Sequence, residues 1–481
     1  MSSPSSPHSL ATLRERHGES YRWRVLLTVM IGTMASFMAS TIVNVAVPDM
    51  SRRFTLGQER AQWLSAGFMA AMTVSMLTTS WLLERFGYRR TYRGAVVLLL
   101  VGSIAGGCSQ TFEWVLAMRV VEGLCAGVLQ PIPAIIVLHA FQKHEQGKAM
   151  GVFGFGVVLA PAVGPSIGGV LVEAFGWRSI FFVVAPFCVV ALELARRYLP
   201  HSAPGGVDVN THRRPLDVAG LALLSVAVVS GLNGLVQLHD ASSGRALGLI
   251  SLAVVAVVGF VVHQRRLLAR ERHPLLQLRL FDDRTFAMGG CVAFIYGMAL
   301  FGSTYLVPVF MQLALKLPPS QAGAVLLPAG LVLALTIPVA GRLADRLPVS
   351  QLVVIGVLLL ALSFALMVTV GLATSLWLIT LWAVVGRVGL GFVLPSLNLG
   401  AMRALPQPLI SQGSSTVNFL RQLGGAVGVN LVGIVLEWRL RVHASAPVQA
   451  FHETFALLAL ITAFAVVAAW RMKLPPPSPL S

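Results

Sequence analysis

The residue best placed for chemistry in this sequence is an acid deep within an apolar run. Glu122 lies about ten residues into the run 112–139, or about 15 Å along a helix that rises 1.5 Å per residue. That depth is near the middle of a bilayer, whereas almost every other one of the 19 carboxylates falls in a loop or at a helix end. An ionised carboxylate at such depth needs a partner, water or a proton.

Arg119 is the nearest partner for this acid. It precedes Glu122 by three residues, so both side chains project from one helix face. Burial favours the protonated acid and Arg119 favours the carboxylate, so a change in hydration could load and release a proton. A cationic ligand would compete for the same carboxylate, which predicts exchange. The alternative is a static buried ion pair that fixes helix packing.

Other polar and aromatic side chains also occur within apolar runs. Aromatic rings can bind lipophilic cations through their faces. For each of these residues the alternative is helix packing, an interfacial position or a hydrogen bond between helices. The candidates to line a substrate cavity are Asn44, Trp63, Phe68, Gln130, Tyr296, Tyr305, Arg387, Asn398, Asn418, Arg421 and Gln422.

Two charged loops have the features of a conformational latch. Glu84 follows a helix C-terminus, whose dipole repels it, so we expect it to contact Arg89, Arg90 or the positive N-terminus of another helix. Breaking such a contact would switch the molecule between two states. A tight turn with retention of positive charge is the simpler interpretation. The candidate gating residues in the two loops are Glu84, Arg85, Gly87, Arg89, Arg90, Asp345 and Arg346.

The run 147–172 carries a stripe of small residues. Gly156, Ala160, Gly164 and Gly168 recur every four residues, which would let a neighbouring helix approach closely. Pro161 and Pro165 each remove an amide donor and should bend the helix. The candidate gating residues in this run are Gly164, Pro165, Gly168 and Gly169.

The chain that positions these residues is strongly apolar. Of its 481 residues, 56% are hydrophobic and 11% charged, and the mean hydropathy is +0.77, as in an all-α polytopic membrane protein. Fourteen runs are long enough to span a bilayer. They are 25–48, 60–83, 92–110, 112–139, 147–172, 178–197, 216–238, 246–264, 285–311, 320–342, 350–371, 374–400, 409–436 and 452–472.

The distribution of basic residues predicts an orientation. Of the 36 Lys and Arg, 25 fall on the side of the predicted membrane that holds both termini, 8 on the other side and 3 inside helices. This asymmetry predicts cytoplasmic termini and accounts for the net charge of +17 without a nucleic-acid partner. The tails over 1–24 and 474–481 are expected to be cytoplasmic, and the first of them disordered.

An internal repeat divides the chain. Glu84 corresponds to Asp345 at an offset of 261 residues, and Arg119 corresponds to Arg387 at an offset of 268. Two similar offsets indicate two homologous halves of six helices each, over 25–197 and 285–473. The segment 198–284 then holds linkers and two inserted helices.

These features together resemble the 14-helix drug:proton antiporters of the major facilitator superfamily, the EmrB/QacA type. The resemblance rests on the segment 41–48, the loop 84–90, Arg119 with Gly123, the segment 160–169 and Arg421-Gln-Leu-Gly-Gly. It implies two six-helix bundles that rock about a central cavity, with two helices inserted between them. The chain departs from the family pattern at Ala39, where an acid is usual, at Glu122, where glutamine is usual, and at Ser80, where glycine is usual.

The function that the resemblance implies is proton-coupled efflux of lipophilic, including cationic, drugs or toxic compounds across a bacterial inner membrane. The proton gradient would supply the energy, with no cofactor and no metal. The implied partners are a small lipophilic substrate, protons and the lipid bilayer, and family analogy alone adds a periplasmic adaptor and an outer-membrane channel.

Other classes of function fit less well. The sequence lacks a phosphate-binding loop and a His-Glu-x-x-His metal motif, and its four cysteines are scattered through apolar segments, so an enzyme is the weakest reading. Export of an anionic or amphipathic metabolite is an alternative, because Arg119, Arg387 and Arg421 outnumber Glu122 in the predicted membrane interior. A non-transporting membrane scaffold or sensor is a second alternative, which a flux measurement would distinguish.

Overall fold

The computed structural model describes residues 9–56, 58–209, 215–238, 243–443 and 446–472. These residues form helices and connecting turns, without a strand among them. The helices are α1 (Leu10–His17), α2 (Tyr21–Arg53), α3 (Gln58–Ser75), α4 (Thr79–Gly107), α5 (Phe112–Leu129), α6 (Ile132–Ala140), α7 (Gln146–Phe175), α8 (Ser179–Tyr198), α9 (Val218–Gln237), α10 (Ser243–Ala269), α11 (Arg284–Val309), α12 (Pro319–Ala344), α13 (Val349–Met367), α14 (Leu376–Arg403), α15 (Ile410–Val442) and α16 (Pro447–Trp470).

The prediction of a disordered tail over 1–24 is wrong from residue 9 onward. Ser9 caps α1, because its hydroxyl accepts a hydrogen bond from the Thr12 amide at 3.2 Å. Leu13 is only 1% exposed and anchors this helix to the core. Composition indicates disorder in this segment, but one capping bond and one buried leucine hold it in place.

Twelve helices in the described part of the chain are long and apolar enough to cross a membrane, against the fourteen predicted. One of the twelve, Trp63–Gly107, reverses its direction at Gly87, where φ is 75°. The Thr91 hydroxyl donates to the Leu82 carbonyl at 2.9 Å, although nine residues of straight helix would separate the two by about 13.5 Å. The predicted loop 84–90 is therefore a tight turn inside α4, and a Cβ at Gly87 would overlap the His201 carbonyl.

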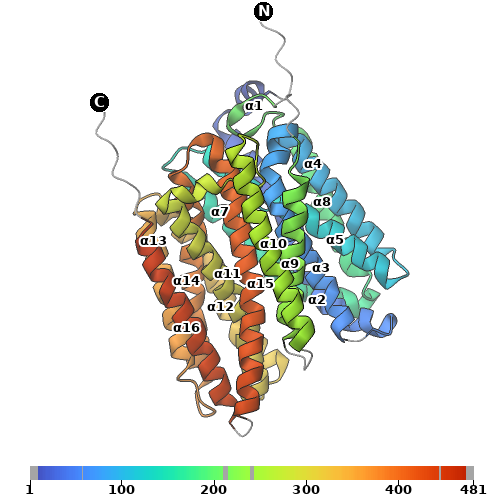
Figure 1. Ribbon diagram of the computed structural model, residues 1–481, viewed down its shortest axis with the longest axis vertical. Coiled ribbons are helices and arrows are strands. Elements are labelled where there is room, and N and C mark those ends of the chain that lie inside the picture. The colour runs from blue at the N-terminus through green and yellow to red at the C-terminus, as the bar shows by residue number, and fades with distance from the viewer. Residues whose placement is uncertain (1–8, 57, 210–214, 239–242, 444–445, 473–481) are drawn as a thin grey trace, which may run out of the picture.

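The helices pack in two groups (Figure 1). In the first group α2 packs against α7 and α8, and α5 packs against α3 and α4. In the second group α11 packs against α15, and α14 packs against α12 and α13. The helices α9 and α10 pack chiefly against each other, and α7 and α12 make the main contact between the two groups.

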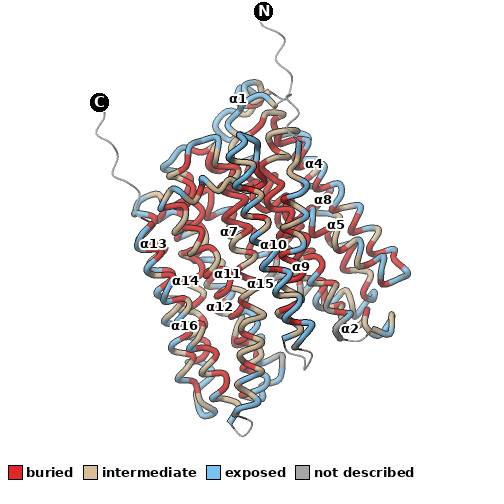
Figure 2. The backbone as a smooth tube through the Cα atoms, viewed as in Figure 1, coloured by how far each residue is buried: buried red, intermediate tan, exposed pale blue. Residues whose placement is uncertain are grey.

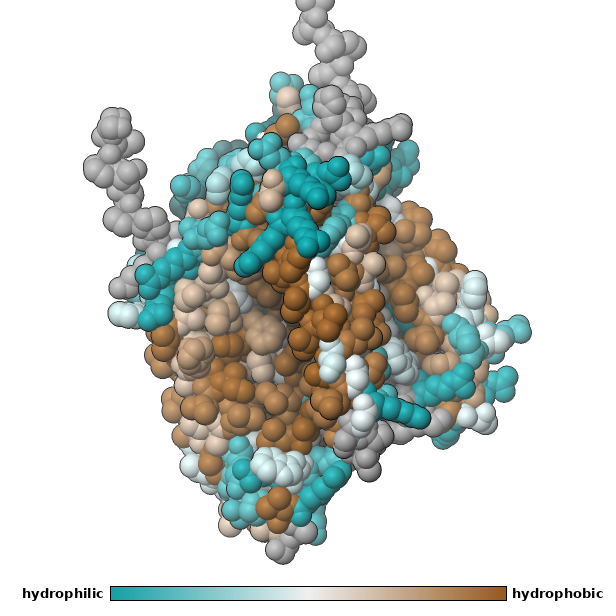
Figure 3. Space-filling model, in the orientation of Figure 1, coloured by the Kyte–Doolittle hydropathy of each residue, from teal (hydrophilic) through white to brown (hydrophobic). Residues whose placement is uncertain are grey.

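The two groups converge toward one end of the molecule. We call the end at which α2 begins and α16 finishes the terminal end, and both chain ends leave the helices there (Figure 1). Buried residues are concentrated near this end, and exposed residues become more common toward the opposite end (Figure 2). A hydrophobic belt separates two hydrophilic ends on the visible face, as expected of a protein embedded in lipid (Figure 3).

Candidate functional site

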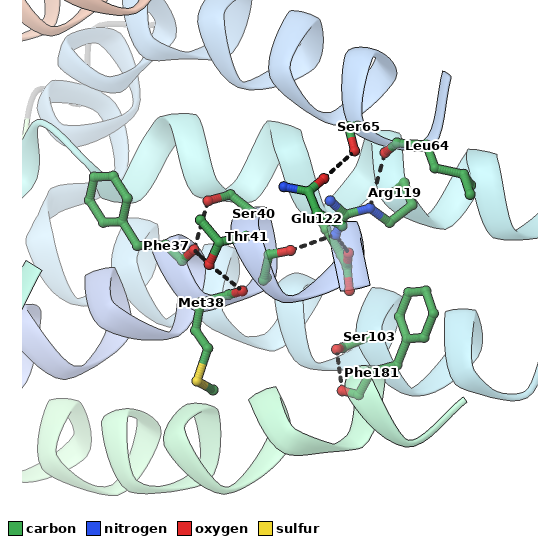
Figure 4. Close-up of polar contacts among 12 residues, drawn as sticks. Phe37, Met38, Ser40, Thr41, Leu64, Ser65, Ser103, Arg119, Glu122 and Phe181 are labelled. Atoms are coloured by element: carbon green, nitrogen blue, oxygen red, sulfur yellow. Dashed lines mark hydrogen bonds and ion pairs between the residues drawn. The ribbon is translucent and has the colours of Figure 1, made fainter. Parts of the chain in front are cut away.

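Arg119 and Glu122 form a buried ion pair on α5. Arg119 Nη1 lies 2.6 Å from Glu122 Oε2, and both side chains are 2% exposed or less. One helical turn separates the two residues, so the helix itself aligns them. Figure 4 shows Arg119 between Glu122 and the backbone of the neighbouring helix α3.

The surroundings of Arg119 hold its guanidinium in place. Its Nη1 donates to the Ala39 carbonyl at 2.9 Å, and its Nε donates to the Leu64 carbonyl at 3.2 Å. The guanidinium carbon lies 4.3 Å from the centre of the Phe68 ring. Phe68, predicted to line a substrate cavity, is instead fully buried and packs against Arg119. These contacts draw α2 and α3 toward α5.

The space beside Glu122 is too small to be a transport cavity. It has a volume of about 10 Å³ and lies among Ile42 of α2, Ser103 of α4 and Phe181 of α8, all in the first helix group. One water molecule needs roughly 10–15 Å³ measured in this way. The predicted exposure of the pair to a hydrated chamber is therefore not met in this conformation. The pair lies inside the first group, not between the groups.

The second helix group also carries two arginines in its interior. Arg421 on α15 donates from Nη2 to Asn418 Oδ1 at 2.8 Å, and Asn418 in turn donates to the Ser414 carbonyl. Arg387 on α14 has no hydrogen-bond or ion-pair partner among the described residues. Both arginines are half-buried, and Tyr296 of α11 lies beside α14, where its hydroxyl donates to the Leu390 carbonyl at 3.3 Å.

The face of α15 that carries Arg421 looks toward the first helix group. The Ser414 hydroxyl donates to the Pro131 carbonyl at 3.0 Å, and the Gln422 amide lies 3.5 Å from Met69 Sδ. Positions 414, 418, 421 and 422 are spaced by three and four residues, which places them on one helix face. Gln422 therefore lies at the boundary between the groups, and Arg421 shares a helix face with Ser414, which meets Pro131 there. Whether these side chains line a substrate cavity stays a prediction.

The remaining predicted cavity residues lie in two kinds of surroundings. Asn44 and Tyr305 are exposed and Trp63 is half-buried, and Asn44 accepts a hydrogen bond from Ser65 at 2.8 Å. Gln130 is 3% exposed and donates to Met72 Sδ, while Asn398 is 9% exposed and donates to the Leu394 carbonyl of its own helix. Both side chains are buried in this conformation.

Asp345 joins the two groups at the terminal end. Its two carboxylate oxygens accept hydrogen bonds from the amides of Gly147 and Lys148 at 2.6 and 2.7 Å. These amides belong to the first turn of α7, where backbone donors have no partner within the helix and the dipole is positive. The predicted latch geometry, an acid on the N-terminus of another helix, is present at Asp345.

A close contact between backbones surrounds this acid. A Cβ at Gly341 of α12 would lie 2.7 Å from Gly151 Cα of α7, so only glycine allows the approach. Arg403 of α14 adds a hydrogen bond to the Lys143 carbonyl at 2.9 Å and lies 3.8 Å from Asp345 Oδ1. Arg346 is exposed, and among the residues described its side chain forms no hydrogen bond or ion pair with the first helix group.

The corresponding turn in the first group is built differently. Arg89 is 7% exposed and donates to the Arg196 carbonyl at 2.9 Å, at the negative C-terminus of α8. Arg85 packs against the rings of Trp81 and Phe86, whereas Arg90 is exposed. Arg89 therefore meets the C-terminus of another helix.

The stripe of small residues on α7 packs within the first group. A Cβ at Gly156 would meet Met30 of α2, and a Cβ at Gly168 would meet Ile42 at 2.6 Å. Gly164 and Gly169 lie in the same interface, next to Thr41 and Val45. The predicted close approach of a neighbouring helix is confirmed. The side chain of Pro165 lies outside the described part of the structure.

Sequence reasoning missed three contributors to these contacts. Gly147, Gly341 and Arg403 complete the closure at the terminal end. The sequence gives little indication of these contacts. An arginine at a helix end next to a basic loop, such as Arg403, is common, and no sequence spacing relates glycines of different helices, such as Gly147 and Gly341. A second missed cluster ties α9 to α10, in which Asp217 accepts hydrogen bonds from His263 at 2.8 Å and from Gln264 at 2.7 Å.

Two groups of apolar helices that close against each other at one end define a polytopic membrane protein of the transporter class. The family model of the Major Facilitator Superfamily matches residues 29–429, and the chain belongs to this superfamily. The family and the fold are those of membrane transporters rather than enzymes.

Individual relatives give the same assignment. The multidrug resistance protein B homolog of Mycobacterium tuberculosis is 30% identical over 430 residues, which cover 86% of this chain and 77% of that protein. The tetracenomycin C resistance and export protein of Streptomyces glaucescens is 28% identical over 422 residues, which cover 87% and 76% of the two chains. The solved structure of the human organic anion transporter TETRAN matches with a TM-score of 0.67 at 17% identity, covering 92% of this chain and 99% of that chain, which shows the fold alone.

Proposed function

We propose that this protein exports lipophilic compounds from the cytoplasm across a bacterial cytoplasmic membrane by alternating access, driven by inward proton movement. The observation that carries the proposal is the closure of the two helix groups by Asp345 on the first turn of α7. A few hydrogen bonds at one end can break and re-form as the groups rock. The relatives named for multidrug resistance and for tetracenomycin C export support a drug-like cargo.

The proposed orientation places the terminal end in the cytoplasm. The excess of Lys and Arg in loops on that side, 25 of 36, supports it. In this orientation the conformation described here is closed toward the cytoplasm. A periplasmic adaptor and an outer-membrane channel are further partners that we propose on family analogy alone.

We also propose fourteen membrane crossings, as in the EmrB/QacA type. The span Trp63–Gly107 supports two crossings, because its chain reverses at Gly87. The 30-residue helix α7 supports another, since 30 residues extend about 45 Å. The helices α9 and α10 would then be the inserted pair over 198–284, between bundles over 25–197 and 285–473.

Proton coupling is proposed to use Glu122, paired with Arg119. Because Glu122 is enclosed in this conformation, protons would reach it only when α2, α4 and α8 move apart. Proton exchange at Glu122 therefore requires that rocking of the two helix groups hydrate the small cavity beside the acid. If the pair serves only in helix packing, the cavity stays closed to water during rocking and proton-coupled flux does not depend on Glu122.

The proposal is tested by flux in proteoliposomes that contain the purified chain. Ethidium and a panel of antibiotics are loaded, a pH gradient is imposed, and probe movement and internal pH are followed together. We expect probe movement opposite to proton movement, abolished by a protonophore. A non-transporting scaffold would give no flux above that of empty liposomes for any probe, which would refute the proposal.

A further inference from the structure

The charge balance of the membrane interior is uneven between the two helix groups. In the first group Arg119 is neutralised by Glu122 at 2.6 Å. In the second group Arg387 and Arg421 lie within membrane-spanning helices, and no carboxylate of the described residues forms an ion pair with either. The interior of the second group therefore carries two positive charges without a counter-ion from the described part of the chain.

The nearest acids along these two helices are far away. Glu437 is 16 residues beyond Arg421 on α15, or about 24 Å. Arg403, which lies 3.8 Å from Asp345, is 16 residues beyond Arg387 on α14, again about 24 Å. Both acids are already engaged, Glu437 with Arg441 and Asp345 with α7. Neither is available to neutralise the two arginines.

Both arginines lie on helix faces directed toward the first group. Arg421 shares its face with Ser414 and Gln422, which contact Pro131 and Met69. Arg387 shares its face with Leu394, whose side chain approaches Gly154 of α7, since seven residues are two helical turns. The Tyr296 hydroxyl donates to the Leu390 carbonyl, one turn beyond Arg387, and a Cβ at the neighbouring Gly297 would overlap the Arg421 carbonyl. The two charges thus belong to one region, on the side where a cargo between the groups would lie.

Most donors of these arginines are unused. The Arg421 guanidinium donates one hydrogen bond, to Asn418, and the Arg387 guanidinium donates none to the residues described. A guanidinium carries five donors in a planar fork that matches carboxylate and sulfonate oxygens. Unpaired charge in a membrane interior is costly and marks a ligand site in many membrane proteins.

We propose that Arg387 and Arg421 form a binding site for the negatively charged group of an amphipathic compound. The ligand would combine a carboxylate or sulfonate with a lipophilic body. Its transport rests on the function proposed above, whereas its binding does not. The enclosed Glu122 leaves a cationic head group without a free acid in the described membrane interior, so the site selects anions over cations.

Paired probes of one shape and opposite charge test the site directly. Binding of 2-naphthalenesulfonate and of 2-naphthyltrimethylammonium to the full chain in lipid nanodiscs is measured by calorimetry, with empty nanodiscs subtracted. We expect the sulfonate to bind at least about tenfold tighter, as for one charge-assisted hydrogen bond. Equal affinity for the two probes, or tighter binding of the ammonium, would overturn the proposal.

Variants assign the binding to the arginines. Arg387→Gln and Arg421→Gln should each weaken sulfonate binding by about tenfold or more, whereas Arg441→Gln, exposed on the same helix as Arg421, should not. Arg421→Lys keeps the charge and should keep the preference for sulfonate, which guards against a loss caused by misfolding. Sulfonate binding unchanged in both glutamine variants, or a preference lost equally in Arg421→Lys and Arg421→Gln, would overturn the site.

Flux separates this proposal from the transport function. If the parent binds the sulfonate through the arginines but moves neither sulfonate nor ethidium in proteoliposomes, the site stands and the transport proposal fails. If ethidium is exported while sulfonate binding is unchanged in Arg387→Gln and Arg421→Gln, the transport proposal is supported and the proposed anion site is refuted. Arginine-dependent binding together with sulfonate flux supports both.

Discussion

At the scale of single residues, the surroundings of Glu122 decide what its carboxylate can do. Arg119 supplies a counter-charge at 2.6 Å, and carbonyls from α2 and α3 fix that arginine. The same contacts that stabilise the charge also close it off, since the adjoining cavity of about 10 Å³ barely admits one water molecule. A proton can therefore reach the acid only through a change in helix packing.

Glu122→Gln should abolish proton-coupled efflux while the protein still inserts and folds. Glutamine keeps an acceptor for Arg119 but cannot take up a proton, so we expect proton-driven flux to fall by about tenfold or more. The measurement is efflux with transport-linked pH change in proteoliposomes. Glu113→Gln, a substitution of an exposed acid on the same helix, is the matched control. Equal flux and equal pH change in Glu122→Gln and parent would assign Glu122 to packing alone.

At the scale of elements, α7 connects the two helix groups through two different faces. Its stripe from Gly156 to Gly168 packs on α2, and its first turns around Gly147 and Gly151 pack on α12. One helix thus packs on the first group through its stripe and on the second group around Gly147, Gly151 and Gly154. Such an arrangement suits a hinge, because one contact persists while the other opens.

Asp345→Ala should weaken the closure at the terminal end. It removes both acceptors of the α7 amides, at a cost of about 1–3 kcal/mol, which shifts a two-state equilibrium by about 5- to 150-fold. Spin labels at the exposed positions His144 and Arg346, on opposite sides of the closure, would report a larger population of long distances. Asp345→Asn keeps one acceptor and should have an intermediate effect. Unchanged distances in Asp345→Ala would show that the glycine contact suffices for closure.

Asp217 makes the α9–α10 pair sensitive to acid. Burial raises the pKa of Asp217, but hydrogen bonds from the Gly220 amide, His263 and Gln264 outweigh it and hold that pKa below the ordinary 3.8. The stabilisation is therefore complete above the ordinary value and is lost as the pH falls through the lower, folded value.

Asp217→Ala should accordingly destabilise the protein by about 2 kcal/mol at neutral pH, through loss of the helix cap and of two buried hydrogen bonds. Thermal unfolding of parent and variant in detergent measures this difference, which should shrink at about pH 3. The exposed Asp208→Ala provides the control and should leave the Tm unchanged at both pH values. A difference between parent and Asp217→Ala that grows as the pH falls would contradict the assigned sign.

At the scale of the whole molecule, the membrane orientation can be read from a native thiol. Cys108 is exposed between α4 and α5, at the end opposite the terminal end, while Cys125 and Cys188 are buried and Cys291 is half-buried. A membrane-impermeant maleimide should therefore label intact cells at Cys108 and should fail to label Cys108→Ser. Labelling of Cys108 only after permeabilisation would invert the proposed orientation.

Much of this molecule follows from its sequence. Most of the fourteen predicted apolar runs coincide with one helix within a few residues, because a spanning segment must satisfy its backbone within itself and its length is set by the bilayer. The run 60–83 instead extends over α3 and the start of α4, and the run 112–139 is divided between α5 and α6. The ion pair of Arg119 and Glu122 follows from helical spacing. The helix dipole predicts contact of Glu84 with Arg89, Arg90 or the N-terminus of another helix, and the structure has the last of these geometries at Asp345, in the matching turn.

The sequence by itself determined which segments form long apolar helices and which charges lie within them, since both depend on local composition and helical period. Only the tertiary structure decided that Glu122 is enclosed within one helix group, that Asp345 meets α7, and that Arg387 and Arg421 lack a counter-ion among the described residues. The physical reason is that these properties depend on which faces of distant helices meet, and helix packing is fixed by close contacts at positions such as Gly151 and Gly341 that no local pattern pairs.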